Sequence, residues 1–127
     1  LDIANTVLAR AQLQGHNGMQ GVSLLPAARG ETTGRDSLVI EEHQRRGYMG
    51  LKNNFRARSL ITTDARLTLY EGVEWGELYD LSRDPDEMNN LWDDPSSRER
   101  RYALTEALVR QMMELADSSP VATHHGP

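Results

Sequence analysis

The chain has 127 residues, no cysteine, and 14 basic against 19 acidic side chains, which gives a formal net charge of −5. This length suits one domain with a modest core and is short for an enzyme with a deep pocket. The negative charge disfavours nucleic acid or an anionic membrane as the main partner, and the lack of cysteine excludes disulfides, thiolate metal sites and a cysteine nucleophile.

The first predicted element is a helix over residues 3–13. Its apolar side chains recur at helical spacing, Asp2 precedes them as an N-cap, and Gly15 follows them as a stop signal. Residues 15–21 hold three glycines and therefore predict a loop with unusual backbone angles. We expect residues 14–36 to form mainly a connection.

Four stretches predict β-strands because they are rich in β-branched and aromatic residues and alternate between apolar and polar positions. They are residues 37–42, 58–63, 66–70 and 77–81. Asp64 and Ala65 separate the second stretch from the third, which is close enough for an antiparallel hairpin. The last three stretches predict a meander, and the first is expected to join it as a fourth strand.

The polar stretch 42–54 predicts a long exposed loop, and such loops often carry function. It holds a cluster of basic and aromatic side chains, namely His43, Arg45, Arg46, Tyr48 and Lys52. Paired arginines bind sulfate or phosphate well because one guanidinium donates two hydrogen bonds to two oxygens. The cluster has two interpretations: a solvated loop without a role, or a loop that contacts an anionic substrate held by other residues.

Two Asp-Pro steps mark the C-terminal half of the chain. Asp84-Pro85 follows the fourth predicted strand and predicts a short helical turn. Asp94-Pro95 repeats this arrangement and begins the longest predicted helix, over residues 95–116. Its predicted face is formed by Leu104, Leu108, Gln111 or Met112, and Leu115, and is widened by Tyr102, Val109 and Met112.

These elements predict an α+β fold. A four-stranded antiparallel sheet is expected to pack against the long C-terminal helix, with a separate helix at the N-terminus. Residues 118–127 contain two prolines and no periodicity, which predicts a mobile tail.

Other constellations favour structural interpretations. The acidic run from Asp80 fails as an EF-hand calcium loop because Pro85 stands at its sixth position and Leu91 at its twelfth. Helix capping and turn formation explain these carboxylates better. No pair of histidines has the spacing of metal ligands on a helix, and no serine lies in a nucleophile elbow. Trp75 and Trp92 are expected to pack at the sheet edges.

The stretch from Glu77 to Leu91 resembles a known family. It reads Glu-Leu-Tyr-Asp-Leu, then Asp-Pro, an acidic residue and Asn-Leu, which is similar to the sequence that closes the C-terminal subdomain of the sulfatases, in the alkaline phosphatase superfamily. Residues 1–8, 19–26 and 58–70 also resemble this family, so the likeness runs from Leu1 to about Ala116. Asn5 stands where the family usually has proline.

The resemblance implies a small C-terminal unit of four antiparallel strands on a helix, completing a large α/β domain that holds the reaction centre. It also implies, for the intact enzyme, calcium and a formylglycine made from a Cys/Ser-x-Pro-x-Arg motif. This chain has no cysteine, and none of its serines is followed by x-Pro-x-Arg. No catalytic or metal-binding residue is therefore transferred, and no cofactor is expected in residues 1–127.

We therefore expect residues 1–117 to be the C-terminal subdomain of a sulfatase-like hydrolase, with residues 1–36 leading into it. The expected partners are the missing catalytic domain and a sulfate-ester substrate, with His43, Arg45, Arg46 and Tyr48 at the rim of the substrate pocket. An isolated fragment is expected to associate with itself through its uncovered apolar face. Two alternatives stay open, a non-catalytic protein-interaction domain and the tail of a phosphonate or phosphate monoester hydrolase of the same superfamily.

The ends and the apolar runs give two further expectations. The chain starts at Leu1 with neither an initiator methionine nor a signal peptide, which indicates a processed or truncated polypeptide. No apolar run approaches the roughly 18 residues that a membrane span needs. The compartment stays open between cytosol and periplasm because the absence of cysteine suits both.

Overall fold

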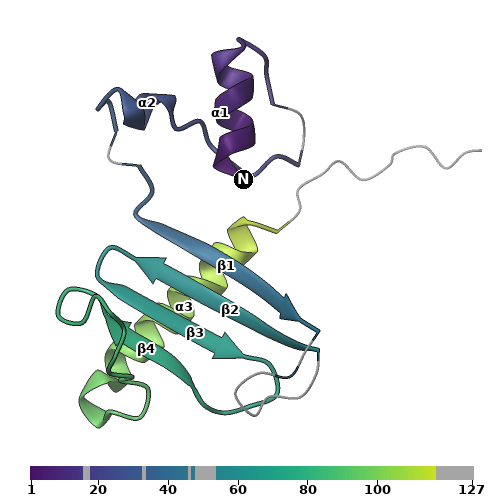
Figure 1. The fold of residues 1–127 in the computed structure, drawn as a ribbon. Coiled ribbons are helices and arrows are strands. Elements are labelled where there is room, and N and C mark those ends of the chain that lie inside the picture. Colours follow the sequence, from purple (N-terminus) through teal and green to yellow (C-terminus); the bar gives the residue numbers. More distant parts are fainter. Residues whose placement is uncertain (16–17, 33, 46, 48–53, 117–127) are drawn as a thin grey trace, which may run out of the picture. The chain divides into compact units, whose positions relative to one another are not determined.

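The computed structural model describes residues 1–15, 18–32, 34–45, 47 and 54–116 (Figure 1). The chain divides into two compact units, Leu1–Arg35 together with the residues after Glu114, and Asp36–Glu114. The second unit contains β1 (Ser37–Gln44), β2 (Phe55–Thr62), β3 (Ala65–Tyr70), β4 (Gly76–Asp80), the 3₁₀ turn η1 (Pro95–Ser97) and α3 (Arg98–Glu114).

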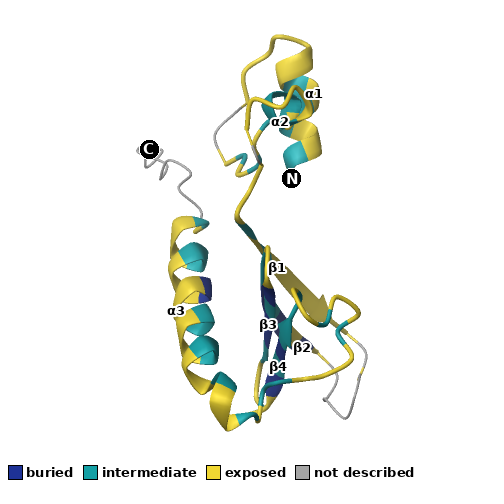
Figure 2. Ribbon diagram, turned by 90° about the vertical axis from the view of Figure 1, so that its left-hand side faces the viewer, coloured by how far each residue is buried: buried dark blue, intermediate teal, exposed yellow. Residues whose placement is uncertain are grey.

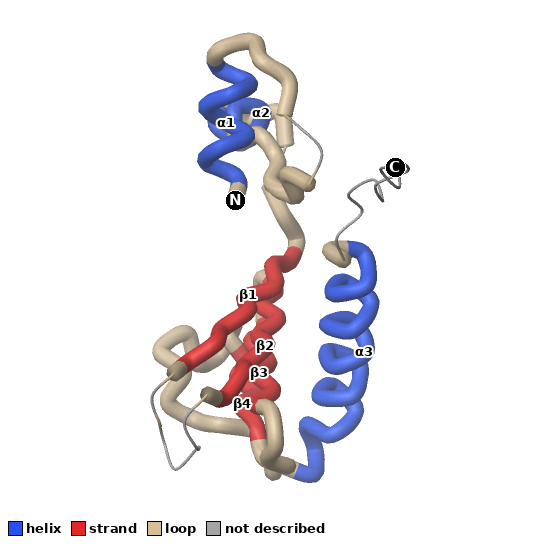
Figure 3. Tube along the Cα trace, turned by 90° about the vertical axis from the view of Figure 1, so that its right-hand side faces the viewer, coloured by secondary structure: helices blue, strands red, loops and turns tan. Residues whose placement is uncertain are grey.

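The sheet of the second unit has four strands in the order β1-β2-β3-β4, and every neighbouring pair is antiparallel. The helix α3 lies against one face of this sheet, so the unit has two layers (Figure 3). The predicted α+β arrangement of a four-stranded antiparallel sheet and a long C-terminal helix is confirmed.

The core between the sheet and α3 is a row of aliphatic side chains, and a second buried cluster, Phe55 and Ala57 packed with Tyr70 and Val73, lies on the other face of the sheet. The register places Val39 opposite Leu60, Leu60 opposite Leu67, and Leu67 opposite Leu78. Leu108 of α3 packs on this row and is the only buried residue of the helix. Figure 2 shows buried residues, in dark blue, on the strands and on α3. Each fully buried leucine contributes about 1.5–3 kcal/mol relative to an exposed one.

The helix uses a narrower stripe than the sequence predicted. Leu104 and Met112 pack at the edge of the core with Leu108, which confirms part of the predicted face. Tyr102 and Val109 remain 62% and 50% exposed, so the prediction that they widen the stripe was wrong. The sheet contacts only one side of the helix, where Leu104, Leu108 and Met112 follow one another at intervals of four residues. The two flanks of the helix stay in solvent.

The hairpin between β1 and β2 is longer than predicted. The paired register continues through Glu42 opposite Ala57 to Gln44 opposite Phe55. The strands therefore extend into polar sequence, because cross-strand hydrogen bonds satisfy the backbone whatever the side chains are. The predicted loop over residues 42–54 was thus wrong for its first residues, and residues 46 and 48–53 lie outside the described residues.

The predicted helical turn after Pro85 is absent. The segment between β4 and η1 is made of turns, and the carboxylate of Asp84 accepts hydrogen bonds from the backbone N–H groups of Met88, at 3.1 Å, and Asn89, at 2.8 Å. The second Asp-Pro step does begin a helical region. Asp94 caps η1 by accepting from the N–H of Ser96, and α3 follows directly.

The N-terminal unit contains α1 (Asp2–Arg10) and α2 (Leu25–Ala28), and neither helix has a buried residue. The predicted helix over residues 3–13 exists but ends earlier, because Gln12 adopts a left-handed φ of 60°. The N–H of Leu13 then bonds to the carbonyl of Leu8, which is the Schellman way of ending a helix. Gly15 is therefore not the stop signal.

Asp2 lies in the first turn of α1 and does not cap it, contrary to the prediction. Its carboxylate accepts from the N–H of Val22 at 2.8 Å and pairs with Arg35 at 2.6 Å. The side chain of Asn5 donates to the carbonyl of Gly21. These contacts fasten the glycine-rich segment and the start of the following connection to α1. No helix in the described part of the chain is long and apolar enough to cross a bilayer.

Candidate functional site

The stretch that carries the family resemblance covers the free edge of the sheet. The side chain of Asn90 accepts from the N–H of Leu78 and donates to the carbonyl of Gly76, both at 3.0 Å. The N–H of Leu91 bonds to the carbonyl of Leu78 at 2.8 Å. An uncovered edge strand exposes unpaired backbone groups that invite association. This stretch therefore satisfies part of the backbone of the β4 edge without forming a fifth strand.

An arginine of α3 fastens the same region to the sheet. Arg100 donates to Asp80 at 3.0 Å and to Asp64 at 2.9 Å, and so joins the end of β4 to the β2–β3 turn. Hydrogen bonds from Ser82 and then from Arg100 hold the pKa of Asp80 below its ordinary value. Asp80 is therefore an ionised structural partner, poorly suited to accept a proton in a reaction.

A polar hollow of about 430 Å³ lies beside this region. It is lined by Asp80, Arg83, Asp84, Asn89, Leu91, Asp94, Ser96, Ser97 and Arg100. The carboxylates here are occupied by local partners, since Asp84 and Asp94 accept from backbone N–H groups and Asp80 from Arg100. The serine hydroxyls donate to Asp94, and hydrogen bonds from Ser96 and Ser97 hold the pKa of that carboxylate below its ordinary value, which makes it a weak base. The hollow is part of the closing turn and contains no arrangement for nucleophilic catalysis.

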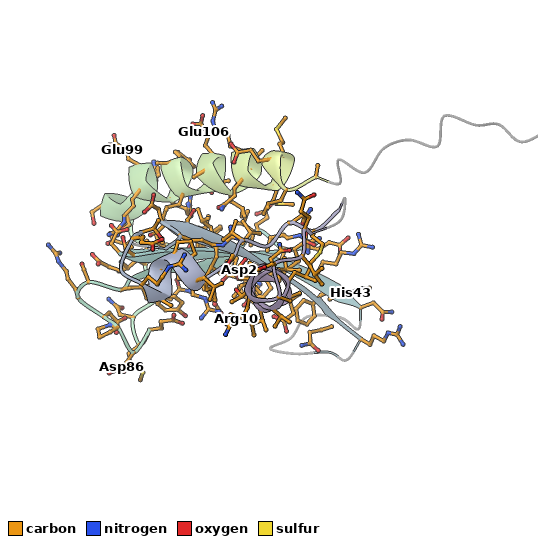
Figure 4. All side chains as sticks on the ribbon, turned by 90° about the horizontal axis from the view of Figure 1, so that it is seen from above. Asp2, Arg10, His43, Asp86, Glu99 and Glu106 are labelled. Carbon is orange, nitrogen blue, oxygen red and sulfur yellow. The ribbon has the colours of Figure 1, made fainter. Side chains whose placement is uncertain are left out.

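Two of the four residues predicted at the substrate rim are described. His43 is the penultimate residue of β1, and Arg45 follows the strand, and both are exposed. Figure 4 shows His43 at the end of the sheet, beyond the span of α3. Arg46 and Tyr48 lie outside the described residues. The whole second half of β1, from Glu41 to Gln44, is exposed on both faces.

The register adds a residue that the sequence alone did not indicate. Arg56 of β2 lies directly opposite His43, so both side chains stand on the same face of the sheet. The two residues are 13 positions apart in the sequence. The predicted second strand began only at residue 58, so Arg56 was not expected to lie in a strand. Arg56 could be found only from the extension of the paired strands into polar sequence, and a search for hydrophobic patterns does not detect such an extension.

The described residues contain no cluster of three or more histidine or carboxylate side chains that could hold a metal ion.

The two tryptophans each pack against other side chains. Trp92 contacts the core, where the guanidinium of Arg101 stacks 4.6 Å from its ring centroid. Trp75 lies 4.8 Å from the ring of Tyr70 on the other face of the sheet. Both rings therefore serve packing.

Comparison with protein families identifies the chain. Residues 1–115 match the family described as N-sulphoglucosamine sulphohydrolase, C-terminal. The chain belongs to this family. It is a C-terminal sulfatase domain, as the resemblance of residues 77–91 and of the earlier stretches implied.

Known proteins resemble the chain over most of its length. It is 27% identical over 120 residues to an uncharacterized protein of Haemophilus influenzae, which covers 91% of this chain and 57% of that protein. Three solved structures share its fold. They are a 2-O GAG sulfatase (24% identity, TM-score 0.75, 92% of this chain), a protein in complex with its substrate D-glucosamine-2-N,6-O-disulfate (24%, 0.76, 97%) and the phosphonate monoester hydrolase of Agrobacterium radiobacter (23%, 0.76, 93%).

The chain spans a quarter of the length of each of these three solved proteins. At these identities the likeness establishes the fold of the chain. It leaves the reaction of the whole protein to be inferred.

Proposed function

We propose that this chain is the C-terminal part of a hydrolase that cleaves sulfate esters, with the reaction centre in another part of the polypeptide. The family match over residues 1–115 carries this proposal. The small share of each solved relative that the chain covers supports a larger catalytic domain. The calcium and formylglycine implied by the resemblance would be held by that domain, because residues 1–127 contain no Cys/Ser-x-Pro-x-Arg motif and no metal-binding cluster among those described.

The sheet face opposite α3 suits packing against the catalytic domain. Leu38 and Ile40 stand on this face of β1 and are 42% and 45% exposed, and Leu38 lies opposite Ile61. Aliphatic side chains on an open sheet face gain about 25 cal/mol for each Å² that a partner covers. In the isolated chain the same face is expected to drive self-association, which sedimentation velocity would measure.

The rim of the substrate pocket is the second proposed contribution of this domain. His43 and Arg45 present N–H donors at an exposed end of the sheet, and Arg46 and Tyr48 belong to the same stretch of sequence. Guanidinium and imidazole groups hold sulfate oxygens by charge-assisted hydrogen bonds. These residues would orient the substrate, while bond cleavage belongs to the catalytic domain.

Hydrolysis of a phosphonate monoester is the second candidate function. The fold of the Agrobacterium radiobacter phosphonate monoester hydrolase matches this chain with a TM-score of 0.76, and that of the Silicibacter pomeroyi enzyme with 0.78. Phosphonates and sulfates both present tetrahedral oxyanions, so the same cationic rim serves either.

The test uses the full-length polypeptide with 4-nitrophenyl sulfate and a 4-nitrophenyl phosphonate monoester. We expect the sulfate to be cleaved with the larger kcat/KM. Replacing Arg45 and Arg46 with alanine should raise KM and leave kcat unchanged, while Arg98→Ala, at an exposed position of α3, should change neither. A preference for the phosphonate would favour the second candidate, and an unchanged KM would remove the rim role. An upstream coding sequence without a Cys/Ser-x-Pro-x-Arg motif would contradict the sulfatase proposal.

A further inference from the structure

The end of the β1–β2 hairpin carries two side chains with N–H donors at directly opposite positions of the register. His43 and Arg56 are directly opposite in the antiparallel register, and such residues have Cβ atoms roughly 5 Å apart on the same face. Both are exposed. Arg45 is exposed as well and follows two residues after His43. This group differs from the rim residues indicated by sequence, because Arg56 comes from the neighbouring strand.

Two of the three carboxylates near this pair have other partners, and the third, Glu71, lies beside Arg56, to whose carbonyl its N–H donates at 2.8 Å. Glu41 lies on the same face as His43, but it pairs with Arg58 at 2.7 Å. Glu42 lies on the opposite face, where Gln44 donates to it. Among the described residues, the side chains of His43 and Arg56 have neither an ion pair nor a hydrogen bond. An oxyanion between them would accept hydrogen bonds from both side chains.

The chemistry of the pair selects an oxyanion. A guanidinium offers a fork of N–H donors and an imidazole offers at least one in either protonation state. Two donor side chains at opposite positions of neighbouring strands suit a group with several oxygens, such as a sulfate or a carboxylate. Both strand segments are fixed by the backbone ladder from Ser37 opposite Thr62 to Gln44 opposite Phe55, so the spacing of the pair is set in advance.

We infer that His43 and Arg56 bind a second anionic group of the substrate, a sulfate or a carboxylate that is not the group being hydrolysed. This inference rests on the proposed function for the identity of the substrate. The reacting sulfate needs a nucleophile and a metal that this chain does not provide, so the anion held here belongs to a more distant part of the same molecule. The pair then determines a preference for substrates that carry at least two anionic groups.

The first test uses the 127-residue chain and inorganic sulfate. Sulfate is titrated against chloride at constant ionic strength, and the amide and side-chain NMR signals of His43 and Arg56 are followed. We expect saturable shifts at these residues. Arg56→Gln should weaken sulfate binding roughly fivefold, as the loss of one charge-assisted hydrogen bond at an exposed site predicts. The matched control Arg98→Gln removes the same charge from α3 and should leave the affinity unchanged.

Two results of this titration would overturn the inference. One is the absence of saturable shifts at His43 and Arg56. The other is an equal weakening by Arg56→Gln and Arg98→Gln, which would mean that sulfate responds only to net charge. Far-UV circular dichroism of both variants checks that the exposed substitutions leave the fold intact.

The second test uses the full-length protein and a pair of substrates, a saccharide with one sulfate and the same saccharide with two. Arg56→Gln should raise KM for the disulfated substrate roughly fivefold, leave its kcat unchanged, and leave both constants for the monosulfated substrate unchanged. Equal changes for the two substrates would overturn the inference. A full-length protein that cleaves no sulfate ester would instead overturn the proposed function, while the sulfate titration would still decide whether the pair binds an oxyanion.

Discussion

Asn90 provides the sharpest test of how this fold is closed. Its side chain makes three hydrogen bonds to backbone groups, from the N–H groups of Leu78 and Trp92 and to the carbonyl of Gly76, each at 3.0 Å. A hydrogen bond of this kind contributes about 0.5–1.5 kcal/mol net. Asn90 is exposed, so water replaces part of what is lost. Asn90→Ala should therefore destabilise the sheet unit by about 2 kcal/mol.

The assay is reversible thermal and urea unfolding followed by far-UV circular dichroism. For a unit of this size, about 2 kcal/mol corresponds to a decrease in Tm of roughly 10 °C. The neighbouring Asn89 is the matched control, because it is exposed and its side chain has no hydrogen bond among the described residues. Asn89→Ala should change the free energy of unfolding by less than about 0.5 kcal/mol. Equal effects of the two substitutions would refute the idea that the closing stretch stabilises the β4 edge.

Three further predictions concern the core, a close backbone contact and pH. Leu108→Ala removes the only buried side chain of α3 and should cost about 3 kcal/mol in urea unfolding, against about 0.5 kcal/mol or less for the half-exposed Val109→Ala. Gly76→Ala places a Cβ 2.6 Å from a ring atom of Trp92 and should lower the Tm by several degrees, with a change in tryptophan fluorescence. The hydrogen bond from Arg35 holds the pKa of Asp2 at about 2, below the ordinary 3.8. The stability that this pair contributes is therefore complete above about pH 4 and is lost as the pH falls toward 2. NMR signals of the α1 amides should change over this pH range in the native chain. They should not change in Asp2→Asn.

The closing stretch and the pair of His43 and Arg56 occupy different parts of the sheet. Asn90 and Leu91 cover the free edge of β4, whereas His43 and Arg56 lie on β1 and β2 at the other side of the strand order. Substitutions in the first group should change stability, and exposed substitutions in the second should change ligand binding. This separation makes the two roles distinguishable by experiment.

The sequence was sufficient to predict the fold class because its signals are local. Alternating strands and the spacing of Leu104, Leu108 and Met112 on the last helix follow from the periods of strands and helices. The order and spacing of four stretches, of which Glu77 to Leu91 is the last, indicated the family, and the match over residues 1–115 confirms it. The role of His43, Arg45, Arg46 and Tyr48 remains a prediction.

What only the tertiary structure decided are the contacts between segments that are distant in sequence. Asp2 looked like an N-cap, but its carboxylate binds Arg35 and the N–H of Val22, which local rules do not anticipate. Tyr102 and Val109 matched the apolar period of the helix, yet the sheet reaches only one narrow stripe. The pairing of His43 with Arg56 depends on the register of β1 and β2, which backbone hydrogen bonds set through polar residues that carry no hydrophobic pattern.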